Sequence, residues 1–111
     1  MKWLSRKEEF VLIAVTCLAE DAYGVSIREY LTKNTGKYWS IGATYDVLDR
    51  LVRKDCLTSI NAEPTPERGG KSKRYYRVTD KGSRALAELR KMETALQVNG
   101  LKRVQRPGEI G

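Results

Sequence analysis

Apolar residues recur with helical spacing through residues 6–20. One stripe at i, i+3, i+4, i+7 and i+8 consists of Phe10, Ile13, Ala14, Cys17 and Leu18. The opposite side is apolar too, through Val11, Leu12 and Val15. A helix that is apolar all round is buried on two sides, so we expect it at the centre of the fold or at a subunit contact. Ser5 and Glu8 have the spacing of a capping box, which places the helix start just after Ser5.

Two further helices are predicted, at 24–34 and 41–54. Gly36 suits the left-handed position that ends the second helix, and Ser40 suits the N-cap of the third. The inner face of the third helix consists of Ile41, Thr44, Tyr45, Leu48, Leu51 and Val52. Its outer face consists of Gly42, Ala43, Asp46, Asp49, Arg50 and Arg53. We therefore expect the inner face to dock on the first two helices and the outer face to meet a partner.

Residues 56–63 and 73–79 are rich in Thr, Ile, Tyr and Val, which predicts two strands. The Pro and Gly residues between them favour a turn, so the pair forms a hairpin. Thr79 then caps a helix to about residue 98, whose apolar residues step by 4, 3 and 4, a seam suited to packing along another helix. These seam residues are Ala85, Leu89, Met92 and Leu96.

The order of these elements is that of a winged helix-turn-helix, an α+β fold that is mainly α. It has a three-helix core, a two-stranded wing and a C-terminal dimerisation helix. We expect the DNA-binding domain at 1–79, the dimerisation helix at 80–99 and a basic flexible tail at 100–111. In this fold the third helix enters the major groove, and the wing meets phosphates or the minor groove.

The net charge of +7 is unevenly distributed. Residues 1–67 hold nine cations and ten anions, whereas residues 68–81 hold six cations and one anion. Residues 82–111 hold six cations and three anions. A basic concentration at the hairpin attracts polyanions, and double-stranded DNA is the partner that this fold favours.

The residue inventory argues against an enzyme. There is no histidine, no phosphate-binding loop and no metal-ligand motif, so we expect no catalytic residue, no metal and no cofactor. The two cysteines, Cys17 and Cys56, are expected to be free thiols in the core. No apolar run reaches 18 residues, so we expect no membrane span, and a cytoplasmic location.

Three motifs resemble the PadR family of bacterial transcriptional regulators, in particular its short members with one C-terminal helix. They are "YG" at 23–24, "SIGATYDVLDRLVRKDCL" at 40–57 and "GGKSKRYYRVTDKG" at 69–82. The resemblance implies a homodimer that binds operator DNA and represses a neighbouring gene or its own. It also implies that the last helix packs against the first helix of the partner protomer.

The positions that match the family imply DNA binding by Ser40, Gly42, Tyr45, Gly69, Gly70, Lys71, Lys73 and Arg74. From the outer face of the third helix and the basic stretch we add Ala43, Asp46, Arg50 and Arg68 as DNA-binding residues. From the apolar faces of the first and last helices we expect a dimer interface of Phe10, Val11, Ala85, Leu89, Met92 and Leu96. Tyr45 fits either a phosphate contact or the core, since tyrosine serves in both places.

Departures from the family pattern leave alternatives open. The family often has Thr, Pro and Arg where this chain has Ala43, Asp46 and Asp49, and its Gly after the third helix is Asp55 here. The carboxylates on the reading face either accept from cytosine, pair with a neighbouring Arg, or repel phosphate. A protein–protein adaptor with weak or no specific DNA binding is the alternative function. An apolar small-molecule effector is a third partner, and Trp3 and Trp39 either line its cavity or pack in the core or an interface.

Overall fold

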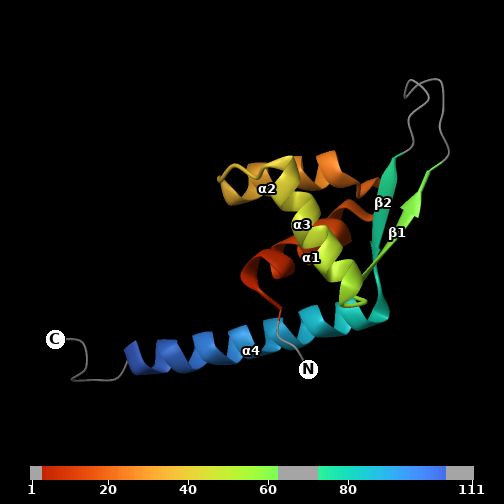
Figure 1. Cartoon of the computed structure of the whole chain (residues 1–111). Coiled ribbons are helices and arrows are strands. Elements are labelled where there is room, and N and C mark those ends of the chain that lie inside the picture. The colour runs from red at the N-terminus through yellow and green to blue at the C-terminus, as the bar shows by residue number, and fades with distance from the viewer. Residues whose placement is uncertain (1–3, 63–72, 105–111) are drawn as a thin grey trace.

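The computed structural model describes residues 4–62 and 73–104, with side chains up to residue 100. Three helices are followed by a hairpin and a long last helix (Figure 1). The elements are α1 (Arg6–Leu18), the 3₁₀ turn η1 (Ala19–Asp21), α2 (Gly24–Thr35), α3 (Ile41–Arg53), β1 (Leu57–Asn61), β2 (Arg74–Val78) and α4 (Asp80–Val104). This is the predicted winged helix-turn-helix shape, and the mainly helical α+β class is confirmed.

The helix ends lie where local chemistry places them. The Ser5 hydroxyl accepts from the Glu8 amide at 3.1 Å, and the Glu8 carboxylate accepts from the Ser5 amide at 2.8 Å, which completes the capping box. The Ser40 hydroxyl accepts from the amide of Ala43 at 3.1 Å and so caps α3. Gly36 ends α2 with φ of 72°. These predicted caps are confirmed.

The core lies between α1, α2, α3 and the hairpin. Its fully buried large side chains include Leu12, Ile27, Leu48 and Tyr76. On α1 the buried residues are Val11, Leu12, Ala14 and Val15, whereas Phe10 and Ile13 are half-buried and Cys17 is exposed. The expectation that Cys17 lies in the core is wrong, because the other apolar side of α1 faces inward. Cys56 is buried as expected, and Trp39 packs in the core.

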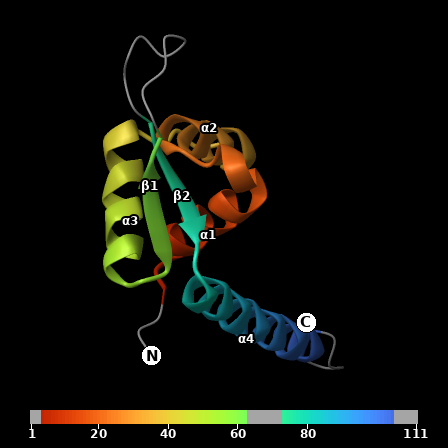
Figure 2. The same ribbon diagram turned by 90° about the vertical axis from the view of Figure 1, so that its right-hand side faces the viewer.

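The hairpin is an antiparallel pair in which Leu57 lies opposite Val78. Figure 2 shows its two strands beside α3. The amide of Tyr76 donates to the carbonyl of Ala22 at 2.8 Å, which ties β2 to the connection between α1 and α2. Tyr76 is buried and Tyr75 is half-buried, so neighbouring tyrosines alternate sides as predicted.

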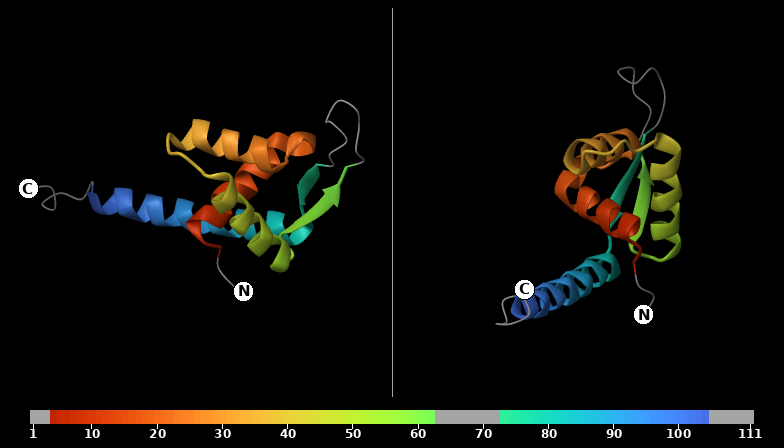
Figure 3. Two further views of the ribbon diagram at one scale, coloured as in Figure 1. Left: turned by 45° about the horizontal axis from the view of Figure 1, so that its top comes forward. Right: turned by 90° about the vertical axis from the view of Figure 1, so that its left-hand side faces the viewer.

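Helix α4 starts under the hairpin, passes the beginning of α1 and then runs beyond the core (Figure 3). It continues through Asn99 and Gly100 to Val104, so the predicted end at residue 99 is wrong. Gly100 does not take a positive φ, and a helix accepts an interior glycine at a cost of about 1 kcal/mol relative to alanine. Residues 100–104 of the predicted tail are therefore helical, and residues 105–111 lie outside the described residues.

Candidate nucleic-acid interface

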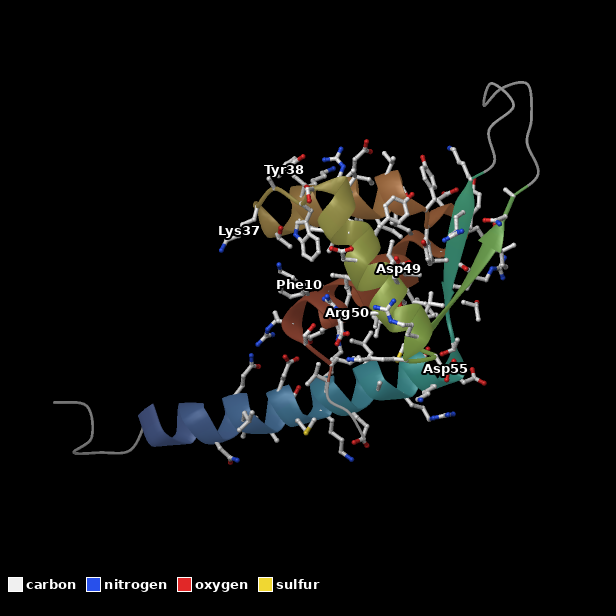
Figure 4. The ribbon with its side chains drawn as sticks, viewed as in Figure 1. Phe10, Lys37, Tyr38, Asp49, Arg50 and Asp55 are labelled. Carbon is white, nitrogen blue, oxygen red and sulfur yellow. The ribbon has the colours of Figure 1, made fainter. Side chains whose placement is uncertain are left out.

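The outer face of α3 is open to solvent along its length. Gly42, Asp46, Asp49 and Arg50 are exposed, Ala43 is half-buried, and the opposite face is held in the core by Thr44, Val47, Leu48 and Leu51. Figure 4 labels Asp49 and Arg50 on α3, and Arg50 Nε lies 3.7 Å from a carboxylate oxygen of Glu8 on α1. The face division is as predicted except that Val47 is buried while Ile41 and Tyr45 lie at the edge. An α-helix presented this way fits a DNA major groove.

Tyr45 packs α3 against the start of α2. Its side chain is 38% exposed, and its ring covers the backbone of Gly24. A Cβ atom at Gly24 would lie 2.5 Å from the Tyr45 ring carbon Cζ, so the Tyr45 ring would have to shift to admit any larger residue. One side of Tyr45 therefore packs against the protein, and its phosphate contact stays a prediction.

Glu8 forms a buried ion cluster with the C-terminal part of α3. Its carboxylate accepts from Lys54 Nζ at 2.7 Å, and its second oxygen lies 3.7 Å from Arg50 Nε. Burial acts to raise the pKa of Glu8, but hydrogen bonds from Lys54 and Ser5 outweigh it and hold the pKa below its ordinary value. The sequence pointed to Glu8 only as a helix cap, because nothing in its spacing pairs it with residues more than 40 positions away.

Arg50 is therefore partly committed to the protein itself. Its side chain is 44% exposed, so the guanidinium reaches both Glu8 and the solvent side of α3. The exposed carboxylates of Asp46 and Asp49 form no ion pair among the residues that the structure describes. Pairing with Arg50 or Arg53, one of the three predicted alternatives for these carboxylates, does not occur in this geometry.

The base of the wing carries two of the predicted cations. Lys73 lies over the ring of Tyr23, with Nζ 4.0 Å from the ring centroid, and Arg74 Nε donates to Asn61 at 3.3 Å. The rings of Tyr23 and Tyr75 meet edge to face at 5.6 Å, which supports this base. Arg68, Gly69, Gly70 and Lys71 lie outside the described residues, so their place in the wing stays a prediction.

A tight joint connects the end of α3 to the start of α4. Asp55 takes the left-handed conformation, with φ of 61°, as expected from its place after the third helix. The Thr79 hydroxyl donates to the Asp55 carbonyl at 2.6 Å and accepts from the Gly82 amide at 3.0 Å. The Thr79 amide donates to the Cys56 carbonyl at 3.0 Å. The same few atoms therefore orient the recognition helix, the wing and α4.

Part of the predicted dimer surface is open and part is not. Phe10, Leu89 and Met92 are half-buried, and Leu96 is 71% exposed. Val11 has no exposed surface in the single chain because it packs inside the chain's own core, and Ala85 is nearly as buried. The place of both residues in a dimer interface stays a prediction.

An ionic contact holds α4 to α1. Arg6 bridges two carboxylates, at 3.2 Å from Glu9 and 3.0 Å from Glu93. Burial, followed by the neighbouring Glu93 carboxylate, raises the pKa of Glu9 above its ordinary value, against the opposing effect of Arg6. The contact lies midway along α4, and beyond it the helix carries the exposed Leu96 and Val98.

The described residues hold neither a metal-ligand cluster nor a helix that could cross a membrane. Within residues 4–62 and 73–104, no three His, Cys, Asp or Glu side chains gather into a group that could hold a metal ion. Among those same residues, no helix combines the length and the apolarity that a membrane crossing requires.

Comparison with known proteins agrees with this arrangement. Residues 12–88 match the transcriptional regulator PadR-like family. A PadR family transcriptional regulator from Eggerthella lenta is 26% identical, with a TM-score of 0.70 over 90% of this chain and 85% of that chain. A PadR-like transcription factor from Bacteroides fragilis is 29% identical, with a TM-score of 0.66 over 83% and 87%. A PadR-like regulator from Bacillus cereus, 20% identical with a TM-score of 0.68 over 90% and 95%, shares the fold. A comparison with curated protein sequences gave no match.

Proposed function

Since the chain belongs to the PadR-like family of transcriptional regulators, which are not enzymes, we propose that it is a homodimeric repressor of a neighbouring gene or its own. The observation that carries this proposal is the exposed outer face of α3, set beside a wing whose base presents Lys73 and Arg74. In the proposed complex α3 occupies the major groove of operator DNA and the wing meets the adjacent backbone.

The first turns of α3 make the proposed base-edge and phosphate contacts. Ser40, Gly42 and Ala43 lie at the helix start, where small side chains and the positive end of the helix dipole allow close approach to DNA. Tyr45 contacts a phosphate with the exposed part of its ring. Arg50 contributes from the last turn of α3, while Glu8 holds its guanidinium from the α1 side.

Dimerisation follows from the apolar surface that the single chain leaves open. In the single chain the seam residues Leu89 and Met92 are half-buried, and Leu96 is exposed. Phe10 and Ile13 on α1 are also half-buried. A helix extending past its core is marginal in water unless a second apolar surface covers it. We therefore place α4 of one protomer along α1 of its partner, which sets the distance between the two recognition helices.

DNA binding is tested by footprinting and by salt titration on the region upstream of the protein's own gene. The expected result is a protected palindrome whose half-sites are a whole number of helical turns apart. Lys73→Gln and Arg74→Gln should each flatten the log–log salt dependence by about 0.9 if each neutralises one phosphate. Lys91→Gln is the matched control, because Lys91 is an exposed cation on α4, far along the chain from the wing.

Two outcomes would reject the proposal. Equal affinity for the upstream region and for random duplex DNA would favour the adaptor, since only the nonspecific electrostatic attraction would remain. An unchanged salt dependence of DNA affinity in both wing variants would reject the proposed wing contact, because neither Lys73 nor Arg74 would then neutralise a phosphate. Asp46→Asn and Asp49→Asn separate the remaining roles of the carboxylates: loss of preference at a C·G pair indicates reading, whereas uniformly tighter binding indicates repulsion of phosphate.

A further inference from the structure

The first turn of α3 carries no charged side chain. It consists of Ile41, Gly42 and Ala43, and the first carboxylate of the helix is that of Asp46, more than one turn further on. Phosphates repel a carboxylate, whereas the positive end of a helix dipole attracts them. In the proposed DNA complex, the uncharged helix start is therefore the part of α3 that comes closest to the duplex.

Gly42 leaves the backbone of this turn uncovered. A Cβ atom there would meet nothing within 4 Å outside the helix's own backbone and the neighbouring residues, so packing inside the protein does not require a glycine. Glycine is also a poor helix former, so helix formation does not explain it either. A bare helix start lets the backbone come close to the floor of a major groove, which brings the side chain beside Gly42 within reach of base edges.

Ile41 is exposed, although the sequence pattern predicts it on the inner face of α3. The residue is 40% exposed and lies outside the apolar core cluster. Within α3, which the structure describes in full, it is the one exposed aliphatic side chain. A β-branched residue is a modest helix former, and an exposed one buries little apolar area. The free protein therefore gains little stability from an isoleucine at this position.

The polar atoms next to Ile41 are already engaged within the helix. The Ser40 hydroxyl accepts from the Ala43 amide at 3.1 Å, and the Thr44 hydroxyl donates to the Ser40 carbonyl at 2.8 Å. Thr44 itself has no exposed surface. What this turn offers to a base edge is therefore mainly apolar contact. In the major groove of B-DNA the apolar group that marks one base from the others is the C5 methyl of thymine.

From these features we propose that Ile41 determines operator specificity by packing against the methyl group of a thymine. This step rests on the proposed function, because it requires α3 to lie in the major groove. Since the dimer presents two copies of α3, each half-site of the operator holds one such thymine. Contacts to phosphates position the protein on the duplex, whereas the contact of Ile41 carries sequence information.

The test removes the thymine methyl group alone. In duplexes of the protected upstream region, each thymine is replaced in turn by deoxyuridine, which pairs in the same way but lacks the C5 methyl. Replacement of one particular thymine in each half-site should weaken the affinity of the unmodified protein about fourfold, the effect of exposing one methyl group to water. In Ile41→Ala the same replacement should have no effect. Ile41→Val, which keeps both branches at Cβ, should retain part of the discrimination.

The matched control is Ile60→Ala, the same substitution at an isoleucine of β1 that is 51% exposed. A wing meets the DNA backbone or the minor groove, and the thymine methyl lies in neither. Ile60→Ala should therefore discriminate thymine from deoxyuridine as the unmodified protein does. Combining Ile41→Ala with deoxyuridine also separates a contact from an effect of DNA shape, because a shape effect would be the same in both proteins.

Three outcomes would overturn the contact while upstream DNA is still preferred over random DNA, so that the proposed function stands. They are a deoxyuridine effect of equal size in Ile41→Ala, the lack of any thymine whose replacement changes the affinity, and uniformly weaker binding of every duplex by Ile41→Ala. The last result would place the side chain against a sugar, which carries no sequence information. Equal affinity for upstream and random duplexes would instead reject the proposed function and the contact together.

Discussion

Gly82 on α4 lies directly against the backbone of Cys56, at the point where the chain leaves the recognition helix for the wing. A Cβ atom at Gly82 would collide with the Cys56 carbonyl oxygen and lie 3.1 Å from a methyl group of Val78. Backbone atoms cannot swing aside as a flexible side chain can. The close approach therefore fixes how α4 leaves the core, and with it the proposed spacing of two recognition helices.

Gly82→Ala should destabilise the fold by about 1–3 kcal/mol, the usual cost of inserting a methyl group where there is no room. Gly100→Ala is the control in the same helix, since the space around Gly100 is open. Replacing this interior helical glycine should stabilise by about 1 kcal/mol. Urea unfolding measures both changes, and equal effects at the two glycines would contradict the close approach.

Asp55→Gly should stabilise the protein by about 0.5 kcal/mol. Asp55 adopts φ of 61°, a conformation that glycine takes without steric cost and that aspartate only tolerates. Asp55→Ala should instead destabilise by about 1 kcal/mol, because alanine has the Cβ penalty and no polar group to offset it. Chemical unfolding of Asp55→Gly and Asp55→Ala should give changes in the free energy of unfolding of opposite sign if the backbone conformation at residue 55 governs stability.

Gly24→Ala should destabilise by about 1 kcal/mol in the unmodified chain, less than Gly82→Ala, because the added methyl group displaces the partly exposed Tyr45 ring and not backbone. In a Tyr45→Ala background the obstacle is gone, and alanine should then be favoured by about 0.5 kcal/mol as a better helix former than glycine. A double-mutant cycle measures this coupling. Additive effects would show that the two residues do not touch in solution.

Glu8→Gln should make the free energy of unfolding depend less on pH in the acidic range. The pKa of Glu8 is lower in the folded chain than in the unfolded one, so its contribution is fully present above the unfolded value of roughly 4.3. This contribution is lost as the pH falls through the folded pKa. At pH 7 the variant should lose about 2 kcal/mol, since Lys54 and Arg50 lose a charged acceptor.

The control for this change is Glu20→Gln, an exposed carboxylate in the η1 turn. Urea unfolding from pH 7 down to pH 3 should show the difference between Glu8→Gln and the unmodified protein shrinking as the pH drops. A difference that stays constant over this range would show that the Glu8 carboxylate gains nothing from its ion cluster.

Local signals were strong enough to predict most of the fold. Ser5 and Ser40 cap helices by accepting from backbone amides three residues further on, and Gly36 ends a helix through its own backbone conformation. These roles depend only on residues that are close in sequence. The outer face of α3 was predictable for a similar reason, because one side of that helix is apolar and the other is polar. The end of α4 was missed, since Asn99 and Gly100 resemble a stop signal yet remain compatible with a helix.

Contacts between distant segments could not be predicted this way. Helix α1 is apolar on both sides, so periodicity could not decide that Val11 faces the core while Cys17 faces solvent. Nor could spacing pair Glu8 with Lys54, or bring Lys37 and Tyr38 next to Phe10. Each of these depends on how the helices cross.

The sequence by itself determined the order of elements, their caps, the polar face of α3 and the basic wing, because these depend on periodicity and local hydrogen bonding. Only the tertiary structure decided which side of α1 is buried, which cations Glu8 binds, and how closely Gly82 approaches Cys56. The physical reason is that burial and Coulomb attraction depend on distances in space, and the number of residues between two positions does not give those distances.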